Sequence, residues 1–123
     1  MTTLTEGKHA GGFLVWEVLR DYTRETVTIA SGAAKLEPGT VLGKITTGGK
    51  YTVLAPAATN GSQNAAGILW AGVDASAADA PGVALLRGPA IVNRHEIVWP
   101  EGATEAQITA ATTALAALGI LLR

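Results

Sequence analysis

The chain has 123 residues, of which 48% are hydrophobic and 15% are charged, and its net charge is −1. This length suits a single domain with one small core. The weak and balanced charge argues against a surface for nucleic acid or for an anionic membrane. The absence of cysteine excludes disulfide bonds, thiol nucleophiles and Cys-ligated zinc.

No apolar stretch approaches the ~20 residues that a membrane-spanning helix needs, and the first residues show no basic region followed by an apolar one. We therefore expect a soluble protein that is made in the cytoplasm. Alanine supplies 23 of the hydrophobic residues. A weakly charged surface rich in small residues suits a protein that is packed against others.

Residues 1–25 are expected to form an extended N-terminal arm. Phe13 and Trp16, two of only six aromatic residues, follow the glycine pair Gly11-Gly12, and a charged run extends from Arg20 to Glu25. These aromatic side chains either fold back onto the core or anchor the arm on another molecule. The glycines and the flanking charges favour the second interpretation.

Residues 26–99 show a β-rich pattern, in which short apolar runs are separated by glycine, proline and polar residues. Gly48-Gly49 lies between two such runs and predicts a tight hairpin, because glycine reaches the positive φ that such turns need. Many short strands at this spacing indicate a small barrel or a folded ribbon. The predicted strands are 26–30, 39–46, 50–54, 66–71, 83–88, 90–93 and 96–99.

One helix is predicted over about 104–118, within a domain that covers 26–123. Thr104 and Gln107 form a capping-box pattern, and Gly119 lies where a C-terminal glycine cap is expected. The face that we expect to be buried carries Ile108, Ala111, Thr112, Leu115 and Leu118. The opposite face is uncharged, which favours contact with a neighbour, and its residues are Ala110, Thr113, Ala114 and Ala117. The apolar tail Ile120, Leu121 and Leu122 must also be buried somewhere.

No catalytic, cofactor-binding or metal site is predicted. The three serines lie in turns or loops of small residues, and none is in a Gly-x-Ser-x-Gly context. His95 belongs to the polar stretch Asn93–Glu96, which is interpreted as a hairpin turn between Ile91-Val92 and Ile97-Val98. Two distant histidines with scattered carboxylates do not supply the three or four converging ligands that a metal needs.

Four short motifs together resemble the bacteriophage lambda head decoration protein D family. They are Gly39–Thr46, Ala65–Leu69, Leu86–Ala90, and Val98–Glu101 with the helix that follows it. Each motif is weak alone, but their order and spacing make the set specific. The resemblance covers about 26–122, and Thr5-Glu6-Gly7 with Phe13-Leu14 also looks like the N-terminal segment of many members.

The resemblance implies a mainly β fold with a short C-terminal helix (α+β): a β-clip-like bent ribbon, or incomplete small barrel. It also implies a capsid decoration protein without enzymatic activity or a cofactor. Such proteins form homotrimers at three-fold and quasi-three-fold positions of an expanded head and stabilise it against the pressure of packaged DNA. The implied partners are the major capsid protein and the chain itself, on the outer surface of a virion made in a bacterial host cytoplasm.

Two sets of interface residues follow. We expect the arm to bind the capsid, because a β-competent, glycine-hinged segment suits strand addition, through Leu4, Phe13, Leu14, Val15 and Trp16. Candidates for the trimer or capsid interface, not assigned to either, are Trp99, Pro100, Ala110, Thr113, Ala114, Ala117, Ile120, Leu121 and Leu122. The alternatives are a small β-rich module that binds carbohydrate or peptide on a phage particle, and a small hydrolase that uses His95.

Overall fold

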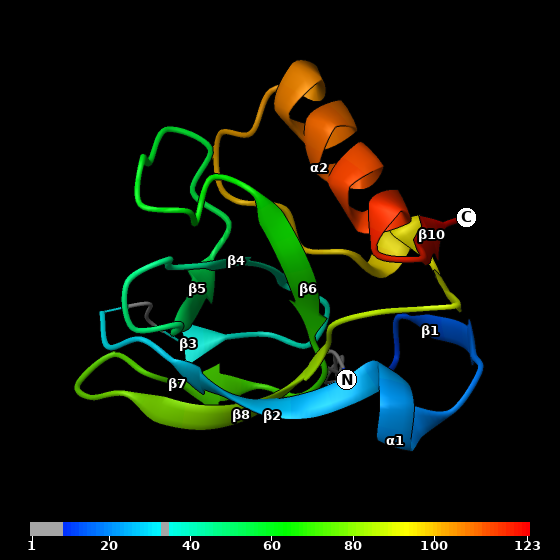
Figure 1. The fold of residues 1–123 in the computed structure, drawn as a ribbon, viewed down its shortest axis with the longest axis horizontal. Coiled ribbons are helices and arrows are strands. Elements are labelled where there is room, and N and C mark those ends of the chain that lie inside the picture. Colours follow the sequence, from blue (N-terminus) through cyan, green and yellow to red (C-terminus); the bar gives the residue numbers. More distant parts are fainter. Residues whose placement is uncertain (1–8, 33–34) are drawn as a thin grey trace, which may run out of the picture.

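The computed structural model describes residues 9–32 and 35–123 (Figure 1). Its main body is a five-stranded barrel in the order β2-β5-β4-β6-β8. The barrel closes at a narrow seam, because β2 and β5 pair only between Ile29 and Tyr51. The barrel strands are β2 (Arg24–Ile29), β4 (Val41–Lys44), β5 (Tyr51–Val53), β6 (Ala65–Leu69) and β8 (Ala80–Leu85). Beside them, β3 (Lys35–Leu36) pairs with β7 (Val73–Asp74).

The hairpin between β4 and β5 is confirmed. The two strands are antiparallel, and Lys44 lies opposite Tyr51. Gly48 and Gly49 both have positive φ, at 89° and 71°, which is the conformation that favours glycine in this turn.

A second sheet joins the two ends of the chain. Its order is β1-β9-β10, formed by β1 (Leu14–Glu17), β9 (Ala90–Val92) and β10 (Ile120–Leu122). The one-turn helix α1 (Arg20–Thr23) leads from β1 into the barrel strand β2, and Figure 1 shows both at the same corner of the molecule. The expected arm of residues 1–25 is therefore corrected for β1 and α1, because they are part of the folded domain.

The C-terminal helix is confirmed as α2 (Glu105–Ala117). Thr104 is its N-cap: its hydroxyl oxygen accepts from the Gln107 N–H at 3.2 Å, and its own N–H donates to the Gln107 side chain at 3.0 Å. Gly119 has a φ of 87°, so the glycine is required where the chain turns from α2 into β10. Ala111 and Leu115 are the buried residues of the helix.

The strand predicted at 96–99 is wrong. A 3₁₀ helix, η1 (Arg94–Glu96), takes up the start of this segment, and only Val98 pairs, in a parallel bridge with Thr40. The Asn93 side chain accepts from the His95 N–H at 3.0 Å and so starts the helical turn. The chain then continues along β4 and does not return along β9.

The core has two parts. One lies between the barrel, α2 and the second sheet and includes Ile68, Leu85, Leu115 and Ile120. The other lies on the opposite side of the barrel wall and includes Ile29, Leu42, Tyr51 and Leu69. The predicted mainly β fold with one C-terminal helix is confirmed. In the described residues, no helix is long and apolar enough to cross a membrane.

Candidate protein-binding surface

Exposed apolar side chains gather in one short segment of the chain. Within the described residues six large hydrophobic side chains are exposed, and five of them lie in β1, in α1 or in the link that joins them. We call these five the β1–α1 patch: Val15, Trp16, Val18, Leu19 and Tyr22. Their exposed fractions range from 48% for Trp16 to 62% for Val15. Several large apolar side chains exposed in one segment of a small domain are typical of a site that binds another molecule.

An irregular pairing in β1 turns the patch outward. The register between β1 and β9 shifts between Leu14 and Trp16, so Val15 is an extra residue on β1. Leu14 packs against the core while both Val15 and Trp16 are exposed. A bulge of this kind is a common way to redirect a side chain at the edge of a sheet.

Trp16 also belongs to a row of apolar residues across the second sheet. Trp16 lies opposite Ile91 on β9, and Ile91 lies opposite Leu121 on β10. Residues directly opposite one another in a sheet point to the same face. Ile91 is half-buried and Leu121 is 41% exposed, so this face extends the β1–α1 patch to the last strand.

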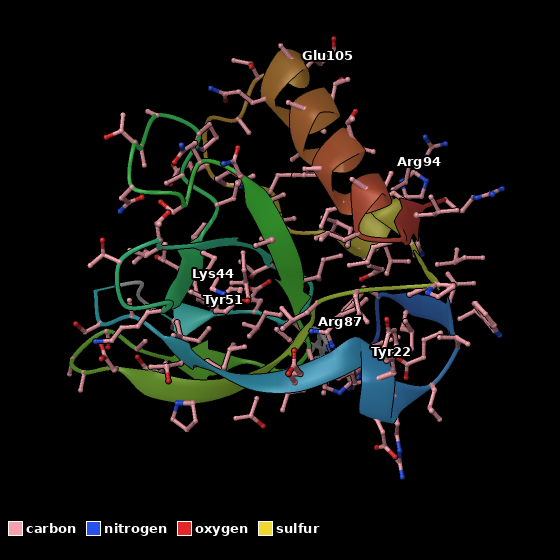
Figure 2. The ribbon with its side chains drawn as sticks, in the orientation of Figure 1. Tyr22, Lys44, Tyr51, Arg87, Arg94 and Glu105 are labelled. Carbon is pink, nitrogen blue, oxygen red and sulfur yellow. The ribbon has the colours of Figure 1, made fainter. Side chains whose placement is uncertain are left out.

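Charged groups border the patch. The Arg87 guanidinium lies 5.6 Å from the centre of the Tyr22 ring, donates to the Tyr22 carbonyl at 2.6 Å and pairs with Glu25. Figure 2 shows Tyr22 and Arg87 close to each other beside α1. Arg20 and Asp21 of α1 are also exposed. A central apolar area with a charged rim is the usual composition of a protein–protein contact.

Phe13 is a correction to the expected arm. Its side chain is only 2% exposed and lies in the core cluster that includes Ile68 and Leu85. Its ring contacts that of Trp70 edge-to-face, with 5.6 Å between ring centres. Phe13 folds back onto the barrel because burial removes its apolar surface from water without a partner. In this conformation it is not available to another protein.

The other predicted interface residues divide into four groups. Ile120 is fully buried and is corrected to a core residue, because its side chain fills the space beneath α2. Ala110, Thr113 and Ala117 are exposed, whereas Trp99, Pro100, Ala114 and Leu122 are half-buried. Leu4 lies outside the described residues.

The surroundings of His95 do not form a nucleophile–base arrangement among the described residues. His95 lies at a surface pocket of about 250 Å³ that is also lined by Trp99 and Thr112. The only hydroxyl of this lining, that of Thr112, donates to the Ile108 carbonyl of its own helix at 2.8 Å. The described residues contain no group of three or more His, Cys, Asp or Glu that could hold a metal ion.

Comparison with known families identifies the chain. The family model described as bacteriophage lambda head decoration protein D matches residues 3–120. The chain belongs to this family. It is therefore a phage head decoration protein, a structural protein whose partner is the phage capsid and whose place is the virion. No curated protein matches the chain.

Sequence reasoning missed the part of the decoration protein's patch that lies beyond Trp16. Val18 and Leu19 directly precede the charged run Arg20–Glu25, and Tyr22 lies within it, but none of the three was given a role from the sequence. A signal was present, since three large apolar residues in a segment too short for an amphipathic helix have no obvious core to face. The β1–β9 pairing that presents them is not visible in the local sequence.

Proposed function

We propose that this decoration protein binds as a homotrimer at the three-fold and quasi-three-fold positions of an expanded phage head. It holds neighbouring capsid subunits together against the pressure of packaged DNA. The observation that carries the proposal is the β1–α1 patch, which we assign to the capsid contact. Family membership supplies the partner, and the patch is the largest group of exposed apolar side chains in the described residues.

Two features favour a strong contact. Trp16 and Tyr22 are large amphipathic side chains, and such residues dominate the free energy of binding when a partner covers them. A trimer presents three copies of the patch, so the second and third contacts form at high effective concentration. A ligand that binds only the assembled shell stabilises that shell, as ligand binding stabilises any state it selects.

The trimer contact is proposed for a different surface. A closed three-fold ring needs two unlike surfaces, each fitting the other on the next copy. The exposed face of α2 carries Ala110, Thr113 and Ala117 and allows close approach, because these side chains are small and uncharged. Ala114 of α2, Trp99 and Pro100 before the helix, and Leu121 and Leu122 after it stay candidates for either the trimer or the capsid.

The test of the capsid contact is a binding titration of purified protein against expanded and unexpanded capsid shells. Sedimentation of the shells separates bound from free protein. We expect wild type to bind expanded shells only, and Trp16→Ala to weaken binding by roughly 1–4 kcal/mol per copy because it truncates a desolvated anchor.

Lys50→Gln is the matched control for this titration. Lys50 is exposed, pairs with Asp79 at 2.5 Å and belongs to the β4–β5 side of the barrel, so its loss should leave binding unchanged. A second variant that lacks residues 2–8 measures the part that Leu4 plays. Equal binding by Trp16→Ala and wild type would contradict the assignment of the patch.

A further inference from the structure

We propose that Glu17, Arg24 and Trp70 are positioning residues that hold the β1–α1 patch in its capsid-binding form. The inference rests on the proposed function and adds to it that the docked segment, not a released arm, is the form that binds. Glu17 lies in β1, Arg24 in β2, and Trp70 directly after β6, and the three residues link the patch to the barrel.

The Glu17 carboxylate is the centre of the link. It accepts from the Thr23 hydroxyl at 2.6 Å and from Arg24 Nε at 3.2 Å, and it forms an ion pair with Arg24 Nη2. Only 10% of the Glu17 side chain and 21% of the Arg24 side chain are exposed. Two donors from one guanidinium fix the relative orientation of the two side chains, which a single hydrogen bond does not.

Trp70 continues the link into the core. The Arg24 guanidinium lies 3.4 Å from the centre of the Trp70 ring, and that ring also contacts Phe13 edge-to-face. The Trp70 carbonyl also accepts from the Gly11 N–H at 2.9 Å. Gly11 and Phe13, which precede β1, therefore contact Trp70 directly, and Glu17 of β1 is connected to it through Arg24.

The segment from β1 to α1 needs these contacts because its exposed side chains do little to stabilise it against the barrel. Val15, Trp16, Val18 and Leu19 are exposed, so they make little packing contact within the chain. Around β1, the Asn93 N–H donates to the Phe13 carbonyl at 2.7 Å, and the Val18 N–H donates to the Pro89 carbonyl at 3.0 Å. A strand of four residues that pairs on one side only is easily opened without side-chain contacts to hold it.

Loss of the link has opposite consequences for the two binding forms. If the docked segment binds the capsid, a smaller docked fraction raises the apparent Kd by the same factor. If a released arm binds, the same change lowers the apparent Kd, because less of the protein is held in the closed form. The sign of the change in affinity therefore decides between them.

The first experiment uses Arg24→Met, which keeps most of the side chain's length and removes its charge. We expect hydrogen exchange of the Val18 and Asn93 amides to become at least tenfold faster. The Leu69 amide, which donates to the Thr40 carbonyl within the barrel, should keep its rate. The apparent Kd for expanded shells should rise at least severalfold. Unchanged or tighter binding by Arg24→Met would overturn the inference.

The second experiment restores the docked form without the ion pair. Glu17 and Ala90 are opposite residues on β1 and β9, and the chain has no other cysteine, so Glu17→Cys with Ala90→Cys offers one defined disulfide. The reduced protein lacks the ion pair and should bind weakly, while the oxidised protein should bind as wild type does. Equal binding by the two redox forms would show that Glu17 does not act by positioning.

Comparison of Arg24→Met with the Trp16→Ala titration separates this inference from the proposed function. If wild type fails to bind expanded shells, or if Trp16→Ala binds as wild type does, the capsid assignment itself fails. If Trp16→Ala weakens binding and Arg24→Met does not, the capsid assignment stands and the positioning role alone is overturned.

Discussion

Trp70 contacts residues that precede β1, and its ring packs closely against Gly11. Gly11 has a φ of 67°, and a Cβ built on it would lie 2.2 Å from Trp70 Cζ2. No side chain fits this position unless the indole moves away from Phe13 and Arg24. The glycine that was interpreted as part of a flexible hinge is instead required by a packed contact.

We predict that Gly11→Ala lowers the free energy of unfolding more than Gly48→Ala does. Both positions have positive φ, which costs an alanine about 1–2 kcal/mol, but nothing lies within 4 Å of a Cβ at Gly48. The clash with Trp70 adds about 1–3 kcal/mol. Urea unfolding at one fixed protein concentration measures the difference, and equal losses for the two variants would argue against the packed contact.

Tyr51 gives the protein a dependence on alkaline pH. Burial of the phenol raises its pKa, and the negative charge of Glu25 raises it further, while Arg87 acts in the opposite direction. Because the folded-state pKa is the higher one, the stabilisation is complete below the ordinary pKa near 10. It is lost as the pH rises through the folded-state pKa.

The matching measurement is the free energy of unfolding of wild type and Tyr51→Phe between about pH 8 and pH 11. Wild type should lose stability more steeply than the variant, which has no phenol to ionise. Lys44 lies 5.8 Å from the centre of the Tyr51 ring and is present in both proteins (Figure 2). Parallel curves would show that burial of the phenol does not shift its titration.

Helix α2 was predictable because its signals are local. Thr104, Gln107 and Gly119 mark its ends within a few residues, and the structure places each in the expected cap. The β4–β5 hairpin was predictable for the same reason. Local chemistry at a turn or a cap decides the backbone there, whatever the rest of the chain does.

The second sheet was not predictable, because its strands are far apart in the sequence. β9 pairs with β1 from one end of the chain and with β10 from the other. The local sequence does not show which surface Phe13 and Ile120 pack against. We therefore predicted that both contact another molecule. Of the five residues in the β1–α1 patch, only Val15 and Trp16 were predicted as binding residues. The bulge that exposes them could not be predicted, because it depends on the register with β9.

We predict that Thr104→Ala lowers the free energy of unfolding by about 1 kcal/mol, because it removes the cap of α2. Thr109→Ala is the control, since Thr109 is exposed within the same helix and alanine is the better helix former. Thermal or urea unfolding compares the two at one concentration. A loss for Thr109→Ala as large as that for Thr104→Ala would contradict a specific capping effect.

Taken as a whole, the molecule has two kinds of surface. The corner formed by β1 and α1 presents large apolar side chains, whereas the exposed face of α2 presents small uncharged ones. A subunit that closes a ring with its own copies and also binds a shell needs its shell contact to be separate from its ring contacts, and these two surfaces are separate. The low charge of the sequence is therefore reflected in the fold, where the exposed face of α2 is uncharged.

Cryo-electron microscopy of expanded shells decorated with this protein tests the central claim most directly. We expect density for three copies at each three-fold and quasi-three-fold position, with β1 and α1 of every copy against the shell and α2 away from it. Shells mixed with the Trp16→Ala variant should show lower occupancy. Density at other positions, or copies that face the shell with α2 while β1 and α1 point outward, would contradict the account.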